Sequence, residues 1–251
     1  MTGLKEAILE KVENNTVLVG VIGLGYVGLP LAITFAKKGV KVLGFEKSET
    51  KLKKLEALEN YISDVDDDDF KEAVASKSFS ATSDFILLKE CDALVICVPT
   101  PLDKYKKPDM SHIEGACIDI GRNMKEGTFI SLESTTYPTT TEDFMLPIIE
   151  RESGKKAGKD FWLCYSPERV DPGNKDFKTE NTPKVVGGLG DDAQEIAMAL
   201  YGKAISSLYP VSSPKIAEMV KILENTYRLI NISMINELAL LAGKMDINIW
   251  E

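Results

Sequence analysis

The sequence predicts an α/β protein with a doubly wound parallel sheet, followed by a long connecting helix. Short runs rich in β-branched residues alternate with helical segments from residue 17 to about residue 210, an order typical of parallel sheets covered by helices on both faces. The uncharged run at residues 17–36, VLVGVIGLGYVGLPLAITFA, places closely spaced glycines where a strand would pass into a helix. Residues 213–242 continue as one apolar helical pattern of roughly 45 Å.

Periodicity and turn residues predict the individual elements. Residues 1–15 have helical spacing and form a short amphipathic helix before the first strand. Strands are predicted at residues 17–22, 41–46, 79–82, 93–99, 128–134, 161–168, 184–188 and 204–211, and helices at residues 30–38, 48–60, 70–77, 111–124 and 191–203. The acidic run DVDDDDF at residues 64–70 lacks the glycine and the distal glutamate of an EF-hand. We interpret it as a solvated loop whose last acidic residues favour the N-terminus of the following helix.

Composition narrows the class of protein. The 251 residues carry a net charge of −9, which argues against nucleic acid or an anionic membrane as the main partner. The N-terminus lacks the pattern of a signal peptide, so a cytoplasmic protein is expected. His112 is the only histidine and the four cysteines show no zinc-like spacing, so neither a Ser-His-Asp hydrolase nor a metal site is expected. The cysteines are interpreted as buried thiols.

The glycines form a G-x-G-x-x-G motif, and each has a separate physical role. Gly23 allows the tight turn after the strand, Gly25 lets a pyrophosphate approach the backbone, and Gly28 lets the helix pack closely on the strand. The phosphates would lie at the positive end of the helix dipole. Glycines that serve only a tight turn are the alternative.

Glu46 ends the second predicted strand, where a carboxylate accepts hydrogen bonds from a ribose diol and repels a 2′-phosphate. The motif and this glutamate together predict a Rossmann-type domain that binds NAD rather than NADP. Lys47 and Lys51 lie close by and weaken that preference.

Three loops rich in proline or hydroxyl groups follow buried strands, where doubly wound sheets place their sites: CVPTPL at 97–102, ESTTYPTTT at 133–141 and YSPERVDPG at 165–173. Turn chemistry alone is the alternative. On the long predicted helix, Lys221, Asn225 and Arg228 share one face at i, i+4 and i+7. An ammonium beside an amide can stabilise an oxyanion or orient a hydroxyl group during its oxidation, whereas a solvated polar face is the alternative.

The segments GLGYVGLPLA, CVPTPL, ESTTYP, YSPERVDPG and KILENTYR, in this order, resemble the UDP-glucose/GDP-mannose dehydrogenase family. SPERVDPG is most similar to the branch that acts on UDP-N-acetylhexosamines, with UDP-N-acetylglucosamine favoured. The resemblance implies oxidation of the C6 hydroxymethyl of a nucleotide sugar to a carboxylate with two NAD, through an enzyme-bound thioester. It also implies a homodimer and a role in making surface polysaccharide precursors.

The resemblance also implies roles for individual residues, carried over by motif. The residues expected to bind NAD, with the glycines Gly23, Gly25 and Gly28, are Tyr26, Val27, Glu46, Lys51, Thr100 and Thr135. Glu168 would act as a base in thioester hydrolysis, Lys221 and Asn225 would contact the developing oxyanion, and Thr135 would lie near the reacting carbon. The residues expected to contact the nucleotide sugar are Glu168, Arg169, Val170, Lys221, Asn225 and Arg228.

The sequence departs from the family pattern at two points. Thr139 replaces a glycine that commonly follows the YP pair, and the G-G-H-C segment that carries the family's nucleophilic cysteine does not occur in the sequence. We therefore expect an NAD-binding domain at 1–210, the long helix of a truncated central domain at 211–251, and no C-terminal UDP-binding domain. This chain is expected to bind NAD without completing the oxidation of a UDP-sugar.

Other functions remain open on the sequence alone. Within the family, UDP-N-acetylmannosamine or UDP-glucose would also fit as the substrate. A β-hydroxyacid dehydrogenase also combines a G-x-G-x-x-G domain with a Lys-x-x-x-Asn helix, but releases one NADH. A non-catalytic NAD-sensing module would need only the glycine turn and Glu46.

Overall fold

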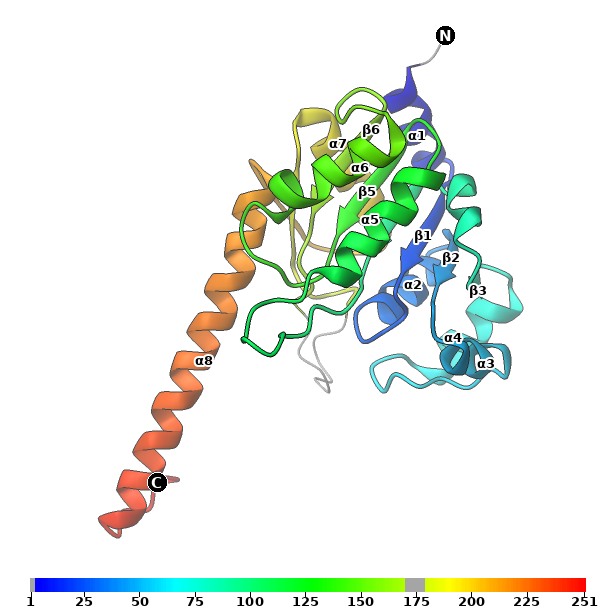
Figure 1. Ribbon diagram of the computed structural model, residues 1–251. Coiled ribbons are helices and arrows are strands. Elements are labelled where there is room, and N and C mark those ends of the chain that lie inside the picture. Colours follow the sequence, from blue (N-terminus) through cyan, green and yellow to red (C-terminus); the bar gives the residue numbers. More distant parts are fainter. Residues whose placement is uncertain (1–2, 170–178) are drawn as a thin grey trace.

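The computed structural model describes residues 3–169 and 179–251 and contains an eight-stranded sheet in the order β3-β2-β1-β4-β5-β6-β7-β8 (Figure 1). The strands are β1 (Leu18–Ile22), β2 (Lys41–Phe45), β3 (Phe79–Thr82), β4 (Ala93–Ile96), β5 (Thr128–Leu132), β6 (Phe161–Tyr165), β7 (Lys184–Gly188) and β8 (Leu208–Val211). Strands β1 to β6 are mutually parallel, so their carboxyl ends share one edge. The strand order reverses between β1 and β4, which is where such sheets bind dinucleotides.

Helices cover both faces of the sheet, which confirms the doubly wound prediction. One core cluster unites the sheet with α1 (Leu4–Glu13), α2 (Gly28–Lys37), α4 (Asp67–Ala75) and α7 (Asp191–Tyr201). The other cluster unites it with α5 (Ser111–Asn123), α6 (Leu146–Ser153) and the first turn of α8 (Pro214–Lys244). The central strands are buried on both faces, as a covered parallel sheet requires.

One strand direction differs from the fully parallel sheet that the sequence predicts. Strand β7 runs antiparallel to β6, with Cys164 opposite Gly188 and Tyr165 opposite Gly187. Strand β8 is parallel to β7 and begins only at Leu208, four residues later than expected. Because β7 is reversed, its first residue lies at the edge where the parallel strands end.

Four local elements also differ from the expectation. Helix α4 already begins at Asp67, because the carboxylate of Asp66 accepts hydrogen bonds from the amides of Asp68 and Asp69 and caps the helix. The last acidic residues of the run lie at the helix N-terminus, as expected, but the helix begins three residues earlier than predicted. The sequence did not predict two short helical turns, the 3₁₀ helix η1 (Phe85–Glu90) and the π-helix η2 (Thr140–Met145). Helix α3 (Glu49–Glu56) is shorter than the predicted helix at residues 48–60.

Helix α8 extends away from the sheet, with the C-terminus near its far end (Figure 1). Pro214, Ala217 and Glu218 near its start are buried. Most other large apolar side chains of the helix are exposed: Ile216, Met219, Leu223, Tyr227, Leu229, Ile230, Ile232, Met234, Ile235, Leu238, Leu240 and Leu241. None of the helices in the described parts of the chain is long and apolar enough to cross a bilayer.

Candidate active site

The glycine turn between β1 and α2 has the geometry that a dinucleotide site requires. Gly23 has a φ of +91°, which favours glycine, and a Cβ there would lie 2.8 Å from the carbonyl oxygen of Cys97. A Cβ on Gly28 would lie 1.9 Å from the carbonyl oxygen of Gly23, so only glycine allows the helix to approach this closely. A Cβ on Gly25 meets open space within 4 Å. The turn therefore fits a pyrophosphate beside Gly25, at the N-terminus of α2.

The two residues after Gly25 also lie at this turn. Tyr26 is 69% exposed, and Val27 is the half-buried residue that precedes the first turn of α2. Both are placed where the sequence analysis expects NAD to bind.

Glu46 lies directly after β2 and is almost fully buried. Its carboxylate accepts hydrogen bonds from the amides of Leu24 (3.2 Å) and Ser48 (3.0 Å) and forms an ion pair with Lys51 Nζ at 2.9 Å. Burial opposes ionisation, but the Lys51 ammonium and the Ser48 amide outweigh it and hold the pKa of Glu46 below its usual value. Glu46 is therefore an ionised acceptor within hydrogen-bond distance of the glycine turn, as ribose recognition requires.

The two lysines near Glu46 have different partners. Lys51 binds Glu46 itself, whereas Lys47 pairs with Asp119 at 3.0 Å and lies 4.9 Å from the centre of the Phe85 ring. Lys47 is therefore held by residues on α5 and η1.

Hydrogen bonds join the loops after β4 and β5. The Thr100 hydroxyl donates to the carbonyl of Thr135 at 2.8 Å, and the Ser134 hydroxyl donates to the carbonyl of Val98 at 2.7 Å. Thr135 itself is exposed. The two threonines predicted to bind NAD are thus brought together, on the same sheet edge as the glycine turn.

Glu168 and Lys221, predicted from separate motifs, lie side by side. Lys221 Nζ donates to the backbone carbonyl of Glu168 at 2.5 Å, and Glu168 Oε1 accepts from the amide of Arg169 at 2.7 Å. Burial lowers the pKa of Lys221, although the Glu168 and Glu224 carboxylates oppose this shift. A lysine with a lowered pKa exchanges protons near neutral pH more readily than an exposed one.

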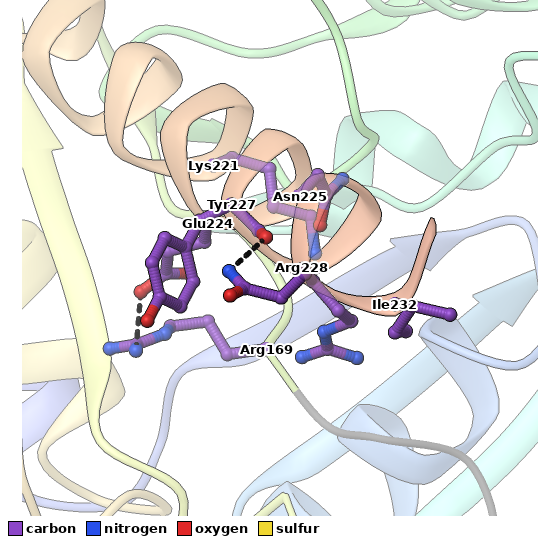
Figure 2. A pocket seen from close by; sticks show the side chains of 8 residues that line it. Arg169, Lys221, Glu224, Asn225, Tyr227, Arg228 and Ile232 are labelled. Atoms are coloured by element: carbon purple, nitrogen blue, oxygen red, sulfur yellow. Dashed lines mark hydrogen bonds and ion pairs between the residues drawn. The ribbon is translucent and has the colours of Figure 1, made fainter. Parts of the chain in front are cut away.

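The predicted polar stripe of α8 lines a pocket of about 430 Å³. Figure 2 shows Lys221, Asn225 and Arg228 on the helix and Arg169 reaching toward it from the loop after β6. Arg169 pairs with Glu224 at 2.5 Å, a contact that the sequence analysis missed. Val170, also predicted to contact substrate, lies outside the described residues.

All four cysteines are buried and unpaired. Burial raises the pKa of the thiols of Cys91, Cys117 and Cys164 to about 12 and that of Cys97 well above its usual value. Thiols in this state are poor nucleophiles. The interpretation of these residues as buried thiols is confirmed.

A buried ion pair next to this site was not predicted. Lys184 Nζ lies 2.6 Å from Glu133 Oε2, and the Tyr201 hydroxyl donates to Glu133 Oε1 at 2.6 Å. The carboxylates of Glu133 and Glu168 outweigh burial and raise the pKa of Lys184, which therefore stays charged. The sequence feature that could have indicated this ion pair is a lysine at the start of an otherwise apolar strand, KVVGG.

A glycine turn, an ionised glutamate directly after β2 and a pocket lined by Lys221 and Arg228 are the combination expected of a domain that binds a nicotinamide dinucleotide. Residues 17–205 match the NAD binding domain of the UDP-glucose/GDP-mannose dehydrogenase family, and residues 215–251 match its central domain. The chain therefore belongs to this family.

Several relatives and solved structures are named as UDP-sugar dehydrogenases. The chain is 39% identical to Protein CapL of Staphylococcus aureus over 92% of its own length and 53% of the relative's. It is 38% identical to UDP-N-acetyl-D-glucosamine 6-dehydrogenase of Pseudomonas aeruginosa, over 92% and 54%. The structure of UDP-D-ManNAc dehydrogenase from Pyrococcus horikoshii superposes with a TM-score of 0.87 at 33% identity, over 93% and 56%. The chain thus spans about half the length of these relatives.

Proposed function

We propose that this chain supplies the NAD-binding half of a cytoplasmic UDP-N-acetylhexosamine 6-dehydrogenase. UDP-N-acetylglucosamine is the favoured substrate, and the uronic acid product would serve surface polysaccharide synthesis. The observation that carries the proposal is the position of the cationic pocket on α8, which meets the loop after β6 through Lys221 and Glu168. Relatives that act on UDP-N-acetylglucosamine and UDP-N-acetylmannosamine support the substrate class.

The residues of the site have roles that fit this reaction. Oxidation of a hydroxymethyl group removes a hydride, which NAD accepts when bound, and a proton from the oxygen. Lys221 takes that proton and stabilises negative charge on the oxygen, and Asn225 orients it through its amide. Arg169 and Arg228 hold the phosphates of the nucleotide sugar.

Glu168 and the cysteines concern the second half of the reaction. Glu168 would activate the water that hydrolyses a thioester. The buried thiols of this chain are unsuited to form that thioester, so we propose that the nucleophilic cysteine is not among the residues of this sequence. The chain alone would bind NAD without two-step turnover.

We also propose that the enzyme is a homodimer joined through α8. The exposed apolar residues of this helix between Leu223 and Leu241 form a continuous stretch that another surface would cover. Light scattering of the chain, compared with a variant carrying Ile235→Asp, tests this. Loss of a dimer in the variant supports the proposal, and a monomer in both contradicts it.

The reaction is tested on the full-length protein that carries this chain. NADH formed per mole of sugar would be measured with UDP-N-acetylglucosamine, UDP-N-acetylmannosamine, UDP-glucose and GDP-mannose. Two NADH per UDP-N-acetylglucosamine are expected. One NADH from a small hydroxy acid would identify a β-hydroxyacid dehydrogenase, and NAD binding without turnover of any substrate would identify a sensing module.

A further inference from the structure

Lys184 reaches the candidate active site because β7 is reversed. The antiparallel register pairs Tyr165 with Gly187. Glu168 follows the end of β6 by three residues and Lys184 is the first residue of β7, so both lie beyond this pair in the same direction. In a parallel strand the first residue would lie at the opposite edge of the sheet, remote from the loops that follow β4, β5 and β6.

The Lys184 side chain is buried and points between two carboxylates. Its Nζ lies 2.6 Å from Glu133 Oε2 and 3.9 Å from Glu168 Oε2. Glu133 is 2% exposed and is fixed by Tyr201, whose hydroxyl also bonds the Ser131 hydroxyl at 2.8 Å. Glu133 therefore anchors the ammonium from the core side, while the face toward the site is occupied by Glu168.

The carboxylate of Glu168 is oriented by contacts at both oxygens. Oε1 accepts the Arg169 amide at 2.7 Å, and Oε2 faces Lys184. The backbone carbonyl of the same residue receives Lys221 Nζ. Negative and positive groups thus alternate from the core to the pocket in the order Glu133, Lys184, Glu168 and Lys221.

We propose that Lys184 is a positioning residue, whose ammonium, anchored by Glu133, holds the Glu168 carboxylate beside Lys221 for its role as a base. The inference rests on the proposed function, because that function gives Glu168 its task. If the pair of Lys184 and Glu133 were purely structural, Lys184 would serve only to neutralise the buried carboxylate of Glu133. An apolar pair of similar volume would replace such a pair without loss of stability, whereas a positioning role requires the ammonium itself.

The test separates these two roles with paired substitutions in the full-length protein. Lys184→Met alone leaves the Glu133 carboxylate buried without its cation, so its melting temperature should fall steeply. Glu133→Met combined with Lys184→Met removes both charges, and Tyr201 keeps the Ser131 hydroxyl as a partner. The double variant should therefore fold with a melting temperature close to that of the parent protein. Lys215→Met, an exposed lysine of α8, is the matched control.

Two measurements on the double variant decide the outcome. For the UDP-sugar reaction, kcat should fall by roughly 10²-fold, which is typical of a misplaced catalytic group, while KM for NAD stays within about threefold. A crystal structure should show the Glu168 carboxylate displaced from its position beside the Lys221 contact. If the double variant has both the melting temperature and the kcat of the parent protein, the proposal is overturned. It is also overturned if the Glu168 carboxylate of the double variant is not displaced.

The crystallographic measurement does not depend on turnover. If Glu168 is displaced but the parent protein oxidises no UDP-sugar, the positioning of Glu168 by Lys184 stands and the proposed function fails. If the parent protein is active and Glu168 stays in place, the positioning inference alone fails.

Discussion

The carboxylate of Glu218, in the first turns of α8, accepts a hydrogen bond from the amide of Thr139 at 2.6 Å. It also accepts the amide of Thr141 at 2.9 Å and the Thr141 hydroxyl at 2.7 Å. Glu218 is fully buried, so these donors replace the water that the carboxylate loses. One side chain thus fixes the start of the long helix against the loop after β5, and through it the stripe that carries Lys221.

Glu218 should make stability depend on pH. Burial raises its pKa, although the bonds from Thr141 and Thr139 oppose the shift. The folded chain therefore holds the proton more tightly than the unfolded chain, and the free energy of unfolding should fall as the pH rises from about 4.3, the ordinary glutamate value, through the raised pKa. Glu218→Gln should lack this decline. Urea unfolding between pH 4 and 7 measures it.

The control for this experiment is Glu237→Gln, which makes the same charge change at an exposed position of α8. The free energy of unfolding of this control should follow that of the parent chain across the pH range. Parallel curves for Glu218→Gln and the parent would show that Glu218 does not titrate differently in the folded state.

Thr139 occupies a left-handed conformation with a φ of 78°, at the position where the family pattern commonly has glycine. A β-branched residue is strained there, so Thr139→Gly should raise the free energy of unfolding by about 1 kcal/mol, net of the extra freedom of glycine in the unfolded chain. The control Thr50→Gly makes the same change at an exposed residue of α3 without positive φ, and should lower the free energy of unfolding by roughly 0.5 kcal/mol. Denaturant titration measures the free energy of unfolding of both variants. Equal destabilisation of the two would contradict strain at Thr139.

Much of this architecture could be predicted from the sequence because local patterns determine it. The glycine turn, Glu46 and the stripe of Lys221, Asn225 and Arg228 each depend on short-range spacing, and all lie where expected. The direction of β7 could not be predicted, because a fully buried five-residue strand shows no difference between its two directions. The pairing of Lys184 with Glu133 follows from that direction and was missed with it.

Glu46 should control the choice between NAD and NADP. Glu46→Ser removes the ribose acceptor and frees Lys51 to meet a 2′-phosphate, whereas Lys47 stays engaged with Asp119. NAD should bind about tenfold more weakly, the loss of one to two good hydrogen bonds, and NADP more tightly than before. Calorimetric titration measures both dissociation constants. The control Glu49→Ser changes an exposed carboxylate on α3 and should alter neither dissociation constant. An unchanged ratio of the NAD and NADP dissociation constants in Glu46→Ser would contradict the role of Glu46 in cofactor choice.

Lys221→Ala separates catalysis from cofactor binding. Lys221 Nζ donates to the Glu168 carbonyl, and burial lowers the pKa of Lys221. In the full-length protein, kcat should fall by roughly 10²- to 10³-fold, the effect of removing one preorganised group at a developing oxyanion, while the NAD dissociation constant stays within about threefold. Stopped-flow NADH formation and calorimetry measure the two. Lys215→Ala, six residues earlier at an exposed position of α8, should leave both unchanged. Full kcat in Lys221→Ala would contradict the role of Lys221 at the developing oxyanion.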